Sequence, residues 1–148
     1  MKYLPLAARI CLSLIFFQAG INHLIGFSEF VPVVAGTGLP LPGLLAAGTV
    51  VFQLLGAIAL VIGYKAKIGA TLLILFLIPA SIFFHPPASD LIGFLKNLSL
   101  IGGLLMVVAY GAGPVSVESA TSASDRGNAG RLGADRVDSE RIDIGSPK

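Results

Sequence analysis

Four long runs of apolar residues occupy most of the first 110 positions of this 148-residue chain. They extend over residues 4–25, 42–63, 68–84 and 91–110. An α-helix needs about 20 apolar residues to cross a hydrocarbon core roughly 30 Å thick, so each run is long enough, with 68–84 at the short limit. The sequence therefore predicts an all-α membrane protein whose four transmembrane helices form an antiparallel bundle.

Composition supports the same class of protein. Hydrophobic residues make up 55% of the chain and charged residues only 12%, a balance that excludes an ordinary soluble domain. Arg9 interrupts the first run, and the sequence that follows contains further spans instead of a soluble mature protein. We therefore expect the first run to be retained as a span and not removed as a signal peptide.

The positions of the cations predict the orientation in the membrane. Lys65 and Lys67 lie between the second and third runs, whereas the first and third loops lack Lys and Arg and contain Glu29 and Asp90. Because short cytoplasmic loops retain Lys and Arg, both termini are predicted to be cytoplasmic. The absence of an Arg-rich, Ser-rich leader favours a bacterial inner (plasma) membrane.

The sequence changes character after residue 114, so we divide the chain into a membrane domain, 1–114, and a tail, 115–148. Ser, Gly, Ala, Asp and Arg dominate the tail, which contains no aromatic residue. Such a segment cannot bury enough apolar surface to offset the entropy of ordering, which predicts a disordered cytoplasmic tail. The formal net charge of +2 comes mostly from ordinary positive-inside loops and gives no case for nucleic acid as a partner.

Residues suited to redox or metal chemistry are few. Cys11 is the single cysteine, so no disulfide can form within the chain and no CxxC pair exists. His23 and His85 are the only histidines, and no span contains a carboxylate. This set lacks convincing ligands for a haem or di-metal centre, although the two histidines could form an axial pair. We predict no catalytic residue and no metal site.

A polar residue within a span costs free energy unless it is paired, faces protein or reaches the interface, which makes Arg9, Gln53 and Lys96 informative. Arg9 and Lys96 each lie about 7 to 8 Å inside a span at 1.5 Å per residue, but they approach from opposite faces and are not expected to share a site. Arg9 is interpreted as an anchor that snorkels to the interface. Gln53 lies too deep to snorkel, so we expect an interhelical hydrogen bond or, alternatively, a contact with a ligand.

Polar residues gather at the predicted outer face. Asn22 and His23 end the first span, His85 lies in the third loop, and Lys96 and Asn97 are near the start of the fourth span. If the first and fourth helices are neighbours, these five side chains surround an interfacial pocket with cationic, amide and imidazole donors. A quinone carbonyl or a lipid phosphate would suit such donors. The alternative is that they are ordinary polar residues at the level of the lipid headgroups.

Several short motifs follow one another in a fixed order along the chain. They are the arginine in the first span and then Ala19-Gly20, Asn22-His23-Leu24, Gly38-Leu39-Pro40, Phe84-His85-Pro86, Phe94-Leu95-Lys96-Asn97-Leu98, Gly102-Gly103-Leu104-Leu105 and Gly111-Ala112-Gly113-Pro114 with Ser116. In this order they resemble the DoxX family of small four-helix membrane proteins, and the resemblance covers residues 4–117 and excludes the tail. The chain departs from the family pattern at Gln53, where members commonly carry glutamate, and at His23, where they commonly carry lysine.

The resemblance implies a function in the membrane. It implies a membrane subunit or accessory of a quinone-linked or thiol-stress redox system, one that is not catalytic alone and whose Lys96-Asn97 pair is the first candidate site. The cofactor to consider is a quinone, and the partners are the lipid bilayer, oxidoreductase subunits and a second copy of the chain. A small four-helix transporter and a non-catalytic lipid-binding or partner-binding protein remain the alternatives.

Overall fold

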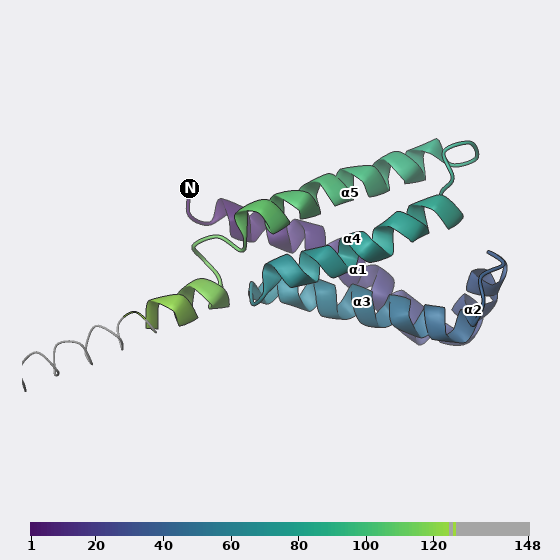
Figure 1. The fold of residues 1–148 in the computed structure, drawn as a ribbon, viewed down its shortest axis with the longest axis horizontal. Helices are drawn as coiled ribbons and strands as arrows, with labels where there is room; N and C mark the ends of the chain where they lie inside the picture. Colours follow the sequence, from purple (N-terminus) through teal and green to yellow (C-terminus); the bar gives the residue numbers. More distant parts are fainter. Residues whose placement is uncertain (125, 127–148) are drawn as a thin grey trace, which may run out of the picture.

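The computed structural model describes residues 1–124 and 126, and these residues contain helices and connecting segments but no strand. Four long apolar helices lie side by side and correspond to the four predicted spans (Figure 1). Their bounds are α1 Leu4–Ile25, α3 Pro42–Ile62, α4 Ala66–Phe83 and α5 Leu91–Tyr110. The predicted all-α architecture with four spans is confirmed, with differences of one or two residues at the ends of α3 and α4.

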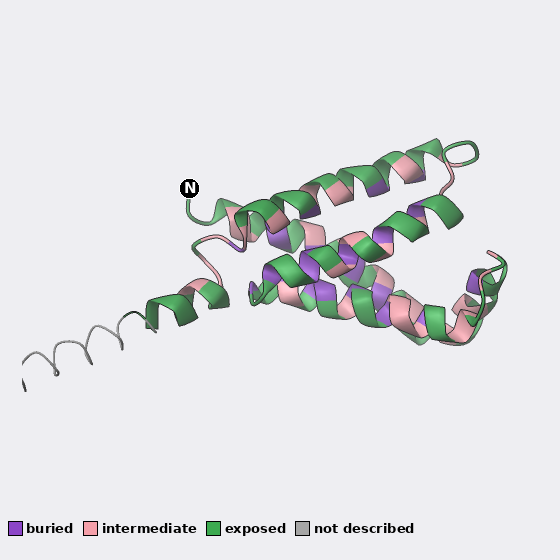
Figure 2. Cartoon of the chain, in the orientation of Figure 1, coloured by how far each residue is buried: buried purple, intermediate pink, exposed green. Residues whose placement is uncertain are grey.

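Each long helix packs against the next long helix along the chain. The helix α1 packs along α3, α3 along α4, and α4 along α5, whereas α1 and α5 contact each other little. The core lies where these pairs meet and includes the fully buried Leu60, Leu73 and Leu104. Figure 2 shows that outward faces are exposed. Because those faces are apolar, they suit a hydrocarbon environment and not water.

Small residues allow the closest approaches between helices. A Cβ atom added to Gly56 of α3 would lie 2.5 Å from Cγ of Leu73 in α4, and one added to Gly69 would lie 2.6 Å from Cβ of Ala59. These contacts follow the rule that membrane helices use small residues to bring their backbones together. Gly43, by contrast, has no atom of a neighbouring helix near it.

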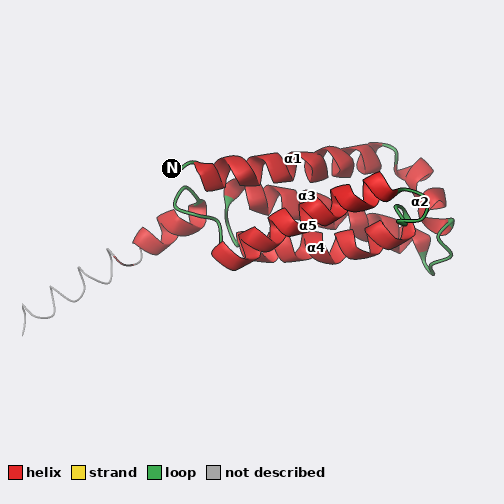
Figure 3. Ribbon diagram, turned by 90° about the horizontal axis from the view of Figure 1, so that it is seen from above, coloured by secondary structure: helices red, strands yellow, loops and turns green. Residues whose placement is uncertain are grey.

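A short helix follows α1, in a segment that the sequence predicted to be a loop. This helix, α2, covers Phe27–Ala35 and lies across one end of the bundle (Figures 1 and 3). It packs mainly on α3 and buries Val34. We call this end of the bundle the α2 end, and we call the opposite end, where α1 begins and α5 finishes, the terminal end.

The first ten residues of the predicted tail are more ordered than expected. Residues 117–124 are helical, and the backbone N–H of Glu118 donates to the carbonyl of Gly63. The hydroxyl groups of Ser116 and Ser119 both donate to the carbonyl of Gly113. Local hydrogen bonds and a contact with the end of α3 therefore hold the start of this segment, and the predicted disorder of the tail stays a prediction. The rest of the predicted tail lies outside the described residues, except residue 126.

The position of the Arg9 side chain differs from that expected of an interfacial anchor. Its side chain is only 1% exposed, so it does not snorkel to the interface. Nη1 donates to the carbonyl of Leu60 at 2.8 Å, and Nη2 donates to the carbonyl of Val115. Leu60 lies in the last turn of α3, where carbonyls lack helical partners and the helix dipole favours a cation. We call Arg9, Leu60 and Val115 the arginine clasp, which joins α1, α3 and the chain after α5 at the terminal end.

A polar cavity at the α2 end

A cavity of about 650 Å³ lies inside the bundle at the α2 end. Its volume is within the range of about 300 to 1,000 Å³ that is typical of pockets for small molecules. The helices α1 to α5 and the segment after α4 contribute to its wall. The wall is mainly apolar, with Phe16, Phe76, Leu77 and Leu100 among its residues, and a few polar groups are set into it.

The structure places the five predicted outer-face residues around this one cavity. Asn22 and His23 line it from α1, His85 from the loop after α4, and Lys96 and Asn97 from α5. The helices α1 and α5 do not pack closely here, so the cavity occupies the space between them. Gln53 also lines the cavity, whereas Arg9 belongs to the arginine clasp at the terminal end.

Asn97 is a mostly buried polar residue of the cavity wall. Its side chain is 6% exposed, and its amide forms no hydrogen bond with any other described residue. Because Asn97 lines the cavity, its donor and acceptor are available to a molecule bound there.

Gln53 and His23 form the interhelical hydrogen bond that was one of the two expectations for Gln53. Nδ1 of His23 lies 3.0 Å from Oε1 of Gln53, joining α1 to α3. Oε1 can only accept, so the proton lies on Nδ1 and the other ring nitrogen is left as an acceptor when the ring is neutral. The Nε2 amide of Gln53 has no partner among the described residues, so it remains free to donate into the cavity.

The same histidine connects α1 to α2. The rings of His23 and Phe30 stack with centroids 3.9 Å apart and an interplanar angle of 10°. Phe30 and Glu29 of α2 both line the cavity, and neither was among the predicted site residues. The signal that could have found them is the apolar spacing Phe27, Phe30, Val31 and Val34, which is the helical pattern of one buried face.

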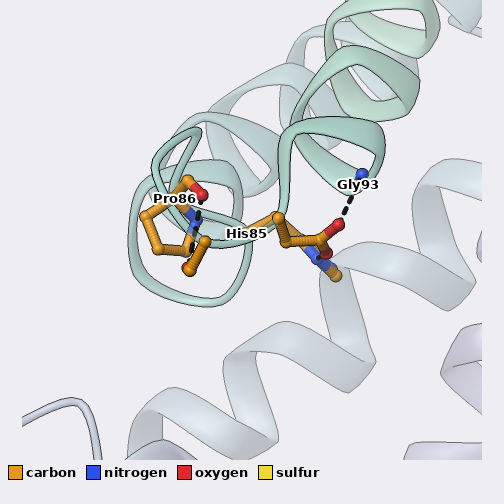
Figure 4. A network of polar contacts seen from close by, with 5 residues as sticks. His85, Pro86 and Gly93 are labelled. Atoms are coloured by element: carbon orange, nitrogen blue, oxygen red, sulfur yellow. Dashed lines mark hydrogen bonds and ion pairs between the residues drawn. The ribbon is translucent and has the colours of Figure 1, made fainter.

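The loop before α5 fixes His85 at the cavity wall. Asp90 is the N-cap of α5, with Oδ1 accepting from the backbone N–H of Gly93 at 2.9 Å and Oδ2 accepting from Nδ1 of His85 (Figure 4). The bond from Gly93 is the main cause, and the bond from His85 the next, of a pKa of Asp90 below its ordinary value. Gly93 is required here because a Cβ at this position would collide with both Asp90 and His85.

The two positions at which the chain departs from the family pattern are thus in direct contact. Gln53 and His23 stand where glutamate and lysine are common, and they hydrogen-bond each other across α1 and α3. An imidazole and an amide therefore meet where the family pattern has lysine and glutamate. Within the described spans, the cavity is left without a carboxylate; Glu29 lines it from α2.

Comparison with known proteins agrees with this fold. The chain is 31% identical over 123 residues to the inner membrane protein YphA of Escherichia coli, an alignment that covers 78% of this chain and 88% of YphA. It is 24% identical over 116 residues to the inner membrane protein YqjF of Escherichia coli, covering 76% of this chain and 88% of YqjF. A shorter similarity, 40% over 78 residues, links it to the ER-derived vesicles protein ERV29 of Saccharomyces cerevisiae and covers 47% of this chain but 25% of ERV29. No solved structure shows a significant match.

The family model that matches is DoxX, over residues 4–86. This match includes α1 to α4 and stops before the later motifs at residues 94–98 and 111–114. It covers more than half of the chain, and the similarity to YphA extends over most of the chain. The protein is therefore a multi-pass membrane protein of the DoxX family.

Proposed function

We propose that the cavity binds a quinone head and that the protein is a membrane subunit or accessory of a quinone-linked or thiol-stress redox system. It does not catalyse a reaction alone in this proposal. The observation that carries the proposal is the unpartnered amide of Asn97 in the wall of a mainly apolar cavity. A molecule bound in the cavity with a carbonyl oxygen could accept a hydrogen bond from this amide.

The donors of the cavity suit the two carbonyl oxygens of a quinone. Lys96 supplies an ammonium group, and Asn97 and Gln53 supply amide donors. The aromatic and aliphatic walls, including Phe16 and Phe76, suit the quinone ring. In the predicted orientation with both termini cytoplasmic, the α2 end faces the outer side of the bacterial inner membrane.

The first experiment is to purify the full chain in nanodiscs made with quinone-containing lipid extract and to measure bound quinone by mass spectrometry. We expect retained quinone in the wild type and a loss of at least about tenfold in Lys96→Met and in Asn97→Leu, equivalent to about 1.4 kcal/mol. Native mass spectrometry of the same sample also gives the number of copies and reveals any oxidoreductase partner.

Matched controls keep the result specific. Gln18→Leu removes an amide from the exposed face of α1, and Lys65→Met removes a cation outside the cavity. Both controls should retain quinone. Equal retention in all four variants and the wild type would contradict the proposal, and a bare or lipid-only protein would favour the transporter or lipid-binding alternative.

A cellular test follows the redox part of the proposal. In a deletion strain, the Lys96→Met, Asn97→Leu double variant should fail to restore resistance to oxidative or thiol stress, while Gln18→Leu should restore it. Full restoration by the double variant at normal protein levels would count against the cavity as the site of function.

A further inference from the structure

The wall of the cavity is incomplete on the side where α1 and α5 diverge. At the terminal end these two helices are held together: Gly103 of α5 packs against Leu12 of α1, and Gly113 packs against Pro5. The arginine clasp adds a hydrogen bond from Arg9 to Val115. All of these contacts involve the first half of α1.

Toward the α2 end, the two helices separate, as Figure 1 shows. Ile15, Ala19 and Asn22 of α1 and Lys96 and Leu100 of α5 line the cavity from its two sides. The other three helix pairs along the bundle pack closely, and they form its back and side walls. The weakest helix–helix packing around the bundle is therefore that between α1 and α5, which touch only away from the α2 end.

The cavity also extends to mid-membrane depth. Ile15, Gln53 and Leu100 lie near the middle of α1, α3 and α5, while His85 lies at the level of the loops. The distance from headgroup level to the midplane is about 15 Å. The end facing water is partly covered by α2, which stacks Phe30 on His23 and buries Val34.

We infer that the cavity opens sideways into the half of the bilayer at the α2 end, between α1 and α5, and that its ligand is a lipid-soluble molecule with an apolar chain that enters from the membrane. The polar head then lies beside Lys96, Asn97 and Gln53, and the chain passes between the two helices into the hydrocarbon. This inference rests on the proposed function for the chemistry of the head, but the lateral opening itself does not require a quinone.

The absence of tryptophan from the chain permits a direct test. The variant Phe76→Trp carries a single tryptophan on the cavity wall, in the middle of α4. The comparison variant Phe52→Trp carries a single tryptophan on the exposed face of α3. Both are reconstituted, without quinone, in bilayers of lipids brominated near the middle of the acyl chain. Quenching by these lipids reports access from the membrane, and quenching by acrylamide reports access from water.

We expect brominated lipid to quench Phe76→Trp to an extent comparable with Phe52→Trp, and acrylamide to quench it weakly. Ala19→Phe, which narrows the opening, should reduce the lipid quenching of Phe76→Trp, whereas Ala109→Phe on the exposed face of α5 should not. Phe16→Trp, also on the cavity wall and near the middle of α1, replaces Phe76→Trp if that variant does not fold.

Quenching of the cavity tryptophan by acrylamide alone, or by neither agent, would overturn the lateral opening. This result is independent of quinone retention. Lipid quenching without any retained quinone would refute the proposed function and leave the lateral opening intact, whereas quinone retention with access only from water would refute the lateral opening and leave the proposed function intact.

Discussion

Arg9 shows how a single residue in a membrane helix can be buried without a counter-charge. It is the only charged side chain that is buried among the described residues, and no carboxylate there pairs with it. Two carbonyls, one at the negative end of the α3 dipole, stabilise the guanidinium. Gly63 allows this approach because a Cβ there would collide with Nη1 of Arg9.

The clasp predicts that Arg9→Lys destabilises the bundle by roughly 1 to 3 kcal/mol, because one ammonium group cannot reproduce the fork that reaches both carbonyls. Thermal unfolding in detergent, followed by circular dichroism, measures the change. Lys65→Met, at an exposed position, should shift stability by no more than about 0.5 kcal/mol. An Arg9→Lys protein that melts like the wild type would show that the two carbonyl contacts contribute nothing.

Asp90 predicts a loss of stability in acid. Its folded-state pKa lies below the ordinary value of 3.8, so the ionised carboxylate is favoured by folding. This contribution is fully present above pH 3.8 and is lost as the pH falls through the lower folded-state pKa. Hydrogen exchange at the Gly93 amide should therefore accelerate in that range. Asp90→Asn, whose side chain does not titrate, should remove the pH dependence; an unchanged profile in this variant would assign it to another group.

At the scale of elements, the four spans could be predicted from the sequence, but the face that each helix turns toward the bundle could not. Length and hydropathy define a span, and the observed α1 and α5 begin and end where predicted. A helix that is apolar all around carries little periodic signal for which face is buried. The sequence therefore indicated that Gln53 must face protein, but it could not identify His23 as its partner.

The sequence did not predict α2, because its nine residues are too few to span a membrane and the segment lies between two spans. Its stacking contact predicts that Phe30→Ala weakens the attachment of α2 by about 1 kcal/mol, the usual contribution of an aromatic pair. Hydrogen exchange over residues 27–35 should accelerate relative to α3. Ser28→Ala, on the exposed face of α2, is the control and should leave exchange unchanged. If both variants exchange like the wild type, the stack does not hold α2.

The molecule as a whole is packed at one end and hollow at the other. Fully buried core residues such as Leu60 and Ala66 lie toward the terminal end, while the cavity lies at the α2 end. The sequence placed the five polar residues on one face, but their arrangement around a cavity depends on the divergence of α1 from α5. That divergence comes from side-chain packing along three helix pairs, and no local pattern encodes it.

The unpartnered amide predicts a conflict between stability and ligand binding. In ligand-free protein, Asn97→Leu should leave the free energy of unfolding unchanged or raise it by up to about 1 kcal/mol, because it replaces a polar side chain in a mainly apolar wall with an apolar one of similar volume. The same variant should lose quinone. Thermal unfolding of delipidated protein measures the first effect, with Gln18→Leu as the exposed control. A clear destabilisation would mean that Asn97 is needed for packing and is not kept for a ligand.

The arginine clasp also constrains the order in which the protein can be completed during synthesis. Arg9 is made first and inserted with α1, but its acceptor at Val115 leaves the ribosome only after all four spans have been translated. Until then, a cation in the first helix lacks one of its two acceptors inside the membrane. The hydrogen bond from Arg9 to Val115 can therefore form only after the fourth span has been made, and it ties the first helix to the chain that follows the last.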